Sequence, residues 1–151
     1  RICHGVGAKL IVNDDLAMAL EIGADGVHLG GTDGDLVAAR AALGPQRILG
    51  ASCYNDISRA ESAAAAGVDY IAFGAMFTST TRPDAVPAPL SILQEAKRFG
   101  LPIAAIGGIK LGNAAEVISA GADMVAVIAD LFDTMDITTR AAHYQDLYIS
   151  P

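Results

Sequence analysis

A short phrase containing glycine and aspartate occurs three times in this chain and constrains its fold more than any other feature. Residues 22–27, 66–71 and 120–125 share one pattern of four successive positions: Ile or Ala, then Gly, then Ala or Val, then Asp. Each copy leads into an apolar run. A glycine in this setting suits the left-handed position just after a helix, and the apolar run predicts a strand. Looser copies occur at Gly7 and Gly100 and, followed by proline, at Gly44. The chain therefore predicts repeated helix-to-strand junctions, which exclude simple hairpins.

The predicted secondary structure alternates strictly between strands and helices. Such alternation predicts a parallel sheet with right-handed crossovers, either open and doubly wound or closed as an eight-stranded barrel. The expected strands cover residues 9–13, 26–29, 47–51, 70–74, 102–106 and 124–128, and the expected helices cover 16–21, 35–43, 56–66, 90–99, 113–120 and 138–147.

Polar residues follow each of the expected strands, and this distribution favours the barrel. Active groups from many strand ends converge on one face of a barrel, whereas an open sheet concentrates them at a switch point. The expected fold is therefore an α/β TIM (β/α)8 barrel, in which residues 1–151 form a single N-terminally truncated domain with strands 3 to 8. Two further βα units are expected before Arg1, and a segment beginning there is not expected to be a stable, active monomer.

Composition narrows the classes of partner. The 151 residues include 10 basic and 17 acidic side chains, for a net charge of -7. Nucleic acid and anionic membranes need a basic surface, so neither is an expected partner. No apolar run is long enough to span a membrane, and two cysteines are too few for a disulfide framework, which favours a reduced, cytoplasmic location. An acidic chain can still bind phosphates locally, through backbone amides, a few cations or a metal.

A glycine pair ends an apolar stretch that has no polar alternation. Residues 101–106 form an apolar run typical of a strand buried on both faces, and Gly107 and Gly108 follow it. Asn113, with an acid three residues later, has the spacing of a helix N-cap. Bare backbone N–H groups before a helix start can bind an anion, phosphate above all. A tight turn without a ligand is the alternative.

Two further groups of polar residues suggest binding chemistry. Asp14 and Asp33 are carboxylates at successive strand ends, and carboxylate oxygens are ligands that Mg²⁺ prefers. Asp is equally favoured as an N-cap, so two helix caps remain an alternative. Residues 76–85 hold four hydroxyl groups and Arg82, which predicts either a clamp over an anionic substrate or an ordinary polar loop.

The remaining chemically interesting residues have plainer interpretations. His28 lies in the middle of a strand and is expected to be a packed histidine. No spacing identifies a histidine partner that would make Cys53 a nucleophile. Cys3 and His4 lack companions for a metal site, and His143 is expected to be solvated.

Taken together, the motifs resemble the thiamine-phosphate synthase family of the thiamine monophosphate synthase superfamily over nearly the whole chain. The resemblance implies a (β/α)8 fold and a Mg²⁺-dependent transferase. Its members couple 4-amino-2-methyl-5-(diphosphooxymethyl)pyrimidine with a thiazole ethyl phosphate, carboxylated or not, to give thiamine phosphate and pyrophosphate. The motifs that carry the resemblance lie at residues 10–14, 26–33, 50–52, 77–85, 105–109 and 125–128.

The resemblance also implies roles for individual residues. Asp14 and Asp33 correspond to the magnesium ligands, and Asn13 and Ser52 to contacts with the pyrimidine diphosphate. Arg82 stands where the family usually has a lysine on the diphosphate, and with Ser52 it is the expected catalytic group. The thiazole phosphate is expected on the loop and backbone positions Ser79, Thr80, Thr81, Gly108, Ile128 and Ala129.

Several departures from the family pattern keep other functions open. The family's Gln-x-Arg-x-Lys cluster is absent and is expected upstream of Arg1. Gly31 stands where the family often has Gln, and Ala129 where it usually has Ser. A thiazole tautomerase of the same superfamily would need a histidine near Ser52, where this chain has Cys53 and Tyr54. A catalytically degenerate phosphate-binding barrel is the second alternative, and a homo-oligomer is left open.

Overall fold

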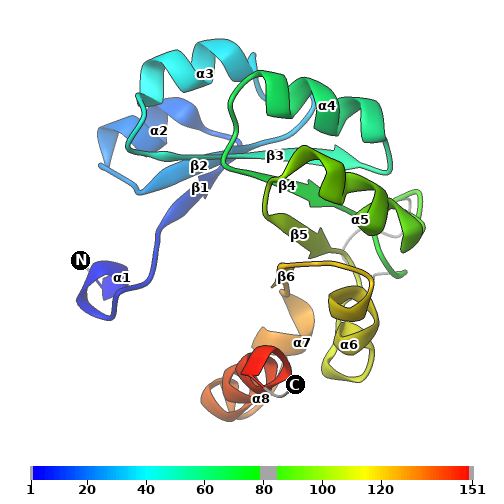
Figure 1. The fold of residues 1–151 in the computed structure, drawn as a ribbon. Helices are drawn as coiled ribbons and strands as arrows, with labels where there is room; N and C mark the ends of the chain where they lie inside the picture. The colour runs from blue at the N-terminus through cyan, green and yellow to red at the C-terminus, as the bar shows by residue number, and fades with distance from the viewer. Residues whose placement is uncertain (1, 79–84, 150–151) are drawn as a thin grey trace.

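The computed structural model describes residues 2–78 and 85–149 and shows a parallel α/β fold (Figure 1). Its sheet has six strands, all parallel, whose spatial order is the order of the chain. The strands are β1 Ile11–Asn13, β2 Gly26–Leu29, β3 Ile48–Tyr54, β4 Tyr70–Phe73, β5 Ile103–Ile106 and β6 Met124–Ala126.

The strand order decides between the two predicted architectures. A doubly wound sheet reverses its strand order at a switch point, and the described strands show no reversal from β1 to β6. The sheet instead curves into a half-barrel, as Figure 1 shows. The expected α/β class with parallel strands is confirmed, and the open, doubly wound alternative is excluded.

Helices connect successive strands and cover the outer face of the sheet. The chain ends with α8, which packs against α6 and α7 (Figure 1). The helices are α1 Ile2–Gly5, α2 Leu16–Glu21, α3 Leu36–Leu43, α4 Ile57–Ala65, α5 Ser91–Ala96, the 3-10 turn η1 Lys97–Phe99, α6 Leu111–Ser119, α7 Ala129–Phe132 and α8 Ile137–Ile149.

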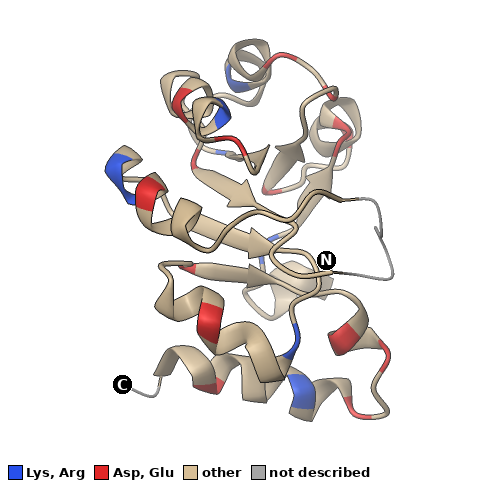
Figure 2. Ribbon diagram, turned by 90° about the vertical axis from the view of Figure 1, so that its right-hand side faces the viewer, with Lys and Arg blue, Asp and Glu red and all other residues tan. Residues whose placement is uncertain are grey.

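The hydrophobic core lies between the sheet and these helices. Alternate strand residues point outward into it, and small helix residues allow the helices to lie close to the sheet. Figure 2 shows the strands without acidic or basic residues, and their sequences contain none. The residues of this core include Val27, Leu29, Leu49, Ile71, Phe73 and Ile103 from the strands and Ala19, Ala39, Ala60, Ala63 and Ala114 from the helices.

The inner face of the sheet is chemically different. Its residues alternate with the core residues along each strand, and their burial ranges from buried Ala72 and Ala104 to exposed Ile106. Polar side chains such as Asn13, His28 and Ser52 lie on this face. Ile106 and Met124, in β5 and β6, are 40% and 39% exposed. The half-barrel therefore presents a mixed polar and apolar inner surface.

The bounds of two elements differ from the prediction in ways that affect the site. Strand β3 continues to Tyr54, with an irregularity in its pairing between Ser52 and Tyr54, so Ser52 lies within the strand and not after it. Helix α6 begins two residues earlier than expected, and the prediction of Asn113 as its N-cap is wrong. Asn113 is the third helical residue, where its Oδ1 accepts the Lys110 N–H at 2.8 Å.

The repeated aspartate makes the same pair of hydrogen bonds each time it occurs, to a residue in or directly before the preceding strand. The Asp69 N–H donates to the Leu49 carbonyl at 2.8 Å, and its Oδ2 accepts the Leu49 N–H at 2.7 Å. Asp25 and Asp123 bond both backbone groups of Leu10 and Ile103 in the same manner. The Leu10 N–H, together with His4 and Lys9, lowers the pKa of Asp25 to about 2. We refer to Asp25, Asp69 and Asp123 as the aspartate clips.

No helix among the described residues is long and apolar enough to cross a membrane.

The aspartate clips generate a prediction for stability. Asp69→Ala is expected to lower the free energy of unfolding by about 1–3 kcal/mol, because it leaves the N–H of fully buried Leu49 without its acceptor. Asp69→Asn keeps an acceptor oxygen and should cost less. Chemical denaturation measures both, with Asp146→Ala on exposed helix α8 as the control. Equal stability of the Ala variant and the wild type would show that the clip contributes nothing.

Candidate active site

Most of the predicted site residues gather at the edge where the carboxyl ends of the strands meet. Asn13 is the last residue of β1, Ser52 lies near the end of β3, and Gly108 follows β5. Ile128 and Ala129 follow β6 at the start of α7. Ser79, Thr80, Thr81 and Arg82 lie outside the described residues.

Asp14 and Asp33 are not the caps of the helices that follow them. Asp15 caps α2 by accepting the Met18 N–H at 2.8 Å. Asp35 caps α3 by accepting the Ala38 N–H at 2.7 Å. The helix-cap interpretation of Asp14 and Asp33 is therefore wrong, because a different aspartate performs that task at each helix.

Asp14 is held in an unusual backbone conformation at the end of β1. Its φ is 65°, in the left-handed region that Asp and Asn tolerate better than most residues. Its N–H donates to the His28 carbonyl of β2 at 2.8 Å, and the Asn13 amide donates to its Oδ2 at 2.6 Å. The two predicted site residues Asn13 and Asp14 are thus in direct contact.

Asp33 closes the turn between β2 and α3. Its Oδ2 accepts the Gly30 N–H at 2.7 Å, and the Tyr54 hydroxyl accepts the Gly31 N–H at 3.0 Å. A Cβ on Gly30 would lie 2.5 Å from the Asp33 Oδ2, so a side chain there would displace the carboxylate. The turn therefore fixes Asp33 beside the end of β2.

The donor set at these two strand ends suits a hard cation. Asp14 and Asp33 follow neighbouring strands β1 and β2 and offer carboxylate oxygens, which Mg²⁺ combines with water and substrate oxygens. Within residues 2–78 and 85–149, no group of three or more His, Cys, Asp or Glu side chains could hold a metal by itself. The arrangement fits a metal shared with an oxygen-rich substrate and does not fit a closed structural site.

Ser52 belongs to a hydrogen-bonded row across three strands. His28 lies 2.8 Å through its Nε2 from the Ser52 Oγ and 2.8 Å through its Nδ1 from the Tyr70 hydroxyl. Gly50 lies between His28 and Tyr70 in the sheet register, and a Cβ there would be 2.1 Å from the Tyr70 ring. The missing side chain at Gly50 is what lets Tyr70 reach His28.

The protonation states in this row follow from burial. Burial lowers the pKa of His28, although the Asp33 charge opposes this, and burial raises the pKa of Tyr70 to about 12. At neutral pH, His28 is therefore neutral and Tyr70 keeps its proton. A neutral imidazole has one N–H and one acceptor nitrogen, so one hydroxyl donates to His28 and the other accepts from it. His28 thus couples the hydrogen-bonding directions of Ser52 and Tyr70, because its tautomer determines which of the two hydroxyls donates.

The glycine pair after β5 allows two backbone segments to approach each other. A Cβ on Gly108 would lie 2.5 Å from the Thr78 carbonyl, and one on Gly107 would lie 2.6 Å from Ala75. The Phe77 N–H donates to the Gly107 carbonyl at 3.0 Å. Both glycines have positive φ values. The pair therefore brings the segment after β4 next to the predicted phosphate turn.

Asp130 anchors the start of α7 to the start of α6. Its Oδ2 accepts from the Tyr144 hydroxyl at 2.7 Å, from Arg140 at 2.8 Å and from the Leu111 N–H at 3.3 Å. Burial opposes ionisation of Asp130, but these bonds outweigh it and lower its pKa. The N-terminus of α7, with Ile128 and Ala129, is thus fixed near the glycine turn.

Some functional candidates could not be found from the sequence. Tyr70 and Arg59 gave no signal, because their contacts depend on strand register and on the placement of α4. The glycine inside β3 was the one available sign, since glycine in a strand often marks a close approach. The structure agrees with the prediction that Cys53 is not a nucleophile, because burial raises the pKa of its thiol to about 12.

Fold and site together define a class of protein: a parallel α/β half-barrel with acidic and hydroxyl side chains at the carboxyl edge, where barrel enzymes carry their active sites. A family model described as thiamine monophosphate synthase matches residues 1–131. The chain belongs to the thiamine monophosphate synthase family.

Individual relatives agree with this assignment. The thiamine-phosphate synthase of Methylobacillus flagellatus is 54% identical over 147 residues, which cover 97% of this chain and 70% of the relative. That of Aromatoleum aromaticum is 55% identical over 148 residues, covering 97% and 71%. These relatives are transferases of thiamine biosynthesis. The family resemblance predicted from the motifs is confirmed.

Solved structures show the same fold. The thiamine phosphate pyrophosphorylase from Pyrococcus furiosus matches with a TM-score of 0.86 and 31% identity, covering 97% of this chain and 70% of that one. A 3-hexulose-6-phosphate synthase from Salmonella typhimurium matches with a TM-score of 0.72 and 20% identity, covering 98% and 77%. The second likeness concerns the fold alone.

The row of Ser52, His28 and Tyr70 generates a prediction for the site. Tyr70→Phe keeps the ring but removes the hydroxyl that contacts the His28 Nδ1. Without this hydrogen bond, both tautomers of the His28 imidazole should be populated. Thiamine-phosphate formation should fall about two- to tenfold in kcat/KM, the effect of one ordinary hydrogen bond. Nitrogen NMR of the His28 ring reports the tautomer directly, with Tyr148→Phe on α8 as the control. Unchanged His28 nitrogen shifts in Tyr70→Phe would contradict the row.

Proposed function

We propose that this chain catalyses the Mg²⁺-dependent coupling of 4-amino-2-methyl-5-(diphosphooxymethyl)pyrimidine with a thiazole ethyl phosphate, giving thiamine phosphate and pyrophosphate. The observation that carries the proposal is the pair Asp14 and Asp33. They follow neighbouring strands, and neither caps a helix, since Asp15 and Asp35 do so. Two carboxylates at neighbouring strand ends are a donor set that a metal shared with a diphosphate can use.

The reaction breaks the bond between the pyrimidine methylene carbon and the diphosphate oxygen and forms a bond from that carbon to the thiazole nitrogen. The carbon becomes cationic as the diphosphate leaves, so the main task of the site is to stabilise negative charge on the leaving oxygens. Asp14 and Asp33 would hold the metal, which supplies Lewis-acid stabilisation of those oxygens. No general base or covalent nucleophile is required.

The chain's own residues bind and orient the two substrates in this proposal. Asn13, in contact with Asp14, and Ser52, oriented by His28, bind the pyrimidine diphosphate. Arg82 stabilises the departing diphosphate. The thiazole phosphate binds to the hydroxyls and backbone amides of Ser79, Thr80, Thr81, Gly108, Ile128 and Ala129.

The geometry around α7 supports this phosphate site. The first N–H groups of a helix have no acceptor within the helix, and α7 begins at Ala129. Asp130 bonds the Leu111 N–H at the start of α6, which follows the Gly108 turn. Alanine in place of the family's usual serine at position 129 keeps the backbone donor.

We further infer that the six strands are strands 3 to 8 of a (β/α)8 barrel and that residues 1–151 belong to a single domain. The sequential parallel order of the strands supports this inference. In a barrel the closing strands pair with β1 and β6 and cover the partly exposed Ile106 and Met124. Both described cysteines are free thiols, which supports a cytoplasmic location.

The tautomerase alternative is less well supported. It calls for a histidine near the end of the strand that carries Ser52, where the chain has buried Cys53 and Tyr54, whose hydroxyl accepts the Gly31 N–H. The histidine that contacts Ser52 is His28, which belongs to the neighbouring strand β2. A degenerate binding barrel would have no need to retain two carboxylates that do not cap helices. The relatives that are more than half identical are named thiamine-phosphate synthases.

The metal proposal predicts different effects for two neighbouring aspartates. Asp33→Asn should lower Mg²⁺-dependent turnover about 10²–10³-fold, because one stabiliser of the developing charge is weakened. Asp35→Asn keeps an oxygen that can cap α3 and should leave turnover near that of the wild type. Turnover is measured over a Mg²⁺ titration. Normal turnover of Asp33→Asn at limiting Mg²⁺ would exclude Asp33 as a ligand.

The two-substrate proposal predicts a division of labour for Arg82. Arg82→Ala should weaken binding of the pyrimidine diphosphate much more than binding of the thiazole phosphate, because the guanidinium pairs with the diphosphate. Arg82→Lys should be mild, since it keeps the charge. Separate titrations with each substrate test this, and equal losses for both would refute the assignment.

A further inference from the structure

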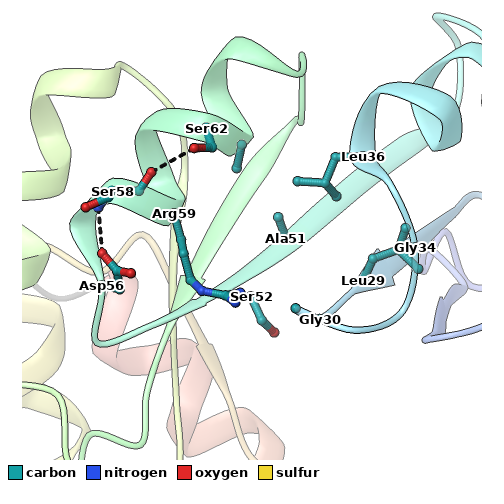
Figure 3. Close-up of a pocket in the computed structure, with 12 residues that line it drawn as sticks. Leu29, Gly30, Gly34, Leu36, Ala51, Ser52, Asp56, Ser58, Arg59 and Ser62 are labelled. Carbon is teal, nitrogen blue, oxygen red and sulfur yellow. Dashed lines mark hydrogen bonds between the residues drawn. The ribbon is translucent and has the colours of Figure 1, made fainter.

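A cavity of about 320 Å³ opens beside the candidate active site, between α3 and α4 at the carboxyl ends of β2 and β3. Its lining includes Gly30, Gly31, Ser52 and Arg59. Figure 3 shows the Arg59 side chain extending from α4 toward Ser52 and Gly30. None of the roles discussed above involves Arg59.

The guanidinium of Arg59 lies over the Tyr54 ring and close to Gly31. Its Cζ lies 5.1 Å from the centre of the Tyr54 ring, and the Tyr54 hydroxyl accepts the Gly31 N–H. A Cβ on Gly31 would lie 2.4 Å from one terminal nitrogen of Arg59 and 2.7 Å from the other. The guanidinium therefore occupies the space that any other residue at position 31 would fill with its side chain.

Arg59 makes no ion pair within 4.0 Å among the described residues, although its charge acts at longer range on Asp56, whose pKa it helps to lower. A guanidinium carries five N–H donors in a fork that matches phosphate oxygens, and these donors lie in the guanidinium plane, so contact of its face with an aromatic ring leaves them available. Its position matters because Ser52 lines the same cavity and Asp33 closes the adjacent turn.

We propose that Arg59 is a binding residue for the diphosphate group, contacting the anionic oxygens of the pyrimidine diphosphate and of the pyrophosphate product. The inference rests on the proposed function, which places the diphosphate between Ser52 and the metal at Asp33. Arg59 approaches this place from α4, over the gap that Gly31 leaves. Gly31 and Arg59 thus act as a pair, in which the glycine admits the cation.

Inorganic pyrophosphate with Mg²⁺ is the probe, and calorimetric titration measures its affinity independently of turnover. Arg59→Ala should weaken pyrophosphate binding about tenfold to a hundredfold, as expected for hydrogen bonds to a charged group. Gly31→Ala keeps the arginine but displaces its guanidinium, so it should also weaken binding. Arg98→Ala, which removes an exposed cation of η1 that pairs with Glu95, is the charge-matched control.

Steady-state kinetics and thermal melts separate the outcomes. The proposal is supported if Arg59→Ala raises the KM of the pyrimidine diphosphate, leaves the KM of the thiazole phosphate unchanged and melts at the same temperature as the wild type. Unchanged pyrophosphate affinity in Arg59→Ala, or an equal loss in Arg98→Ala, would overturn the proposal. A wild-type protein that binds pyrophosphate through Arg59 but forms no thiamine phosphate would instead contradict the proposed function alone.

Discussion

The double hydrogen bond from one aspartate to both backbone groups of a residue in, or directly before, the preceding strand aligns three of the five strand pairs of this sheet. Parallel strands have no hairpin to fix their alignment, and a shift of one residue would turn every side chain to the other face. The aspartate clips lock β1 to β2, β3 to β4 and β5 to β6 at the amino ends of the strands. The clips therefore align the carboxyl ends, where the candidate site lies.

Glycines at several positions allow chemically active groups from different elements to approach one another at the candidate site. Gly50 gives Tyr70 access to His28 across a strand, and Gly31 admits the guanidinium of Arg59. Gly108 lets the backbone of Thr78 come close to the turn after β5. In each case the missing side chain is replaced by a group from another element. The high glycine content thus reflects close approaches as well as helix ends.

The sequence predicted the elements much better than it predicted the site contacts. The repeated phrase preceded β2, β4 and β6, its looser copies preceded β1, β3 and β5, and the bounds of α2 and β2 match the prediction. The prediction failed at the start of α6, because Lys110, the residue directly before this helix, is not a residue type recognised as an N-cap. The roles of Asp14 and Asp33 stayed ambiguous in the sequence, since adjacent aspartates compete for the same cap. Only three-dimensional geometry shows which carboxylate bonds the helix.

The placement of acidic groups explains how a chain with a net charge of -7 can bind two phosphorylated substrates. The aspartate clips lie at the amino edge of the sheet, away from the site. The caps Asp15, Asp35 and Asp56 lie nearer to it, but each bonds a backbone N–H, and the positive end of the helix dipole offsets its charge. The repulsion between these carboxylates and a phosphate group is thereby reduced at the candidate site. In the proposed site, two carboxylates would hold the metal and Arg59 would supply a cation, so local geometry would determine binding more than net charge does.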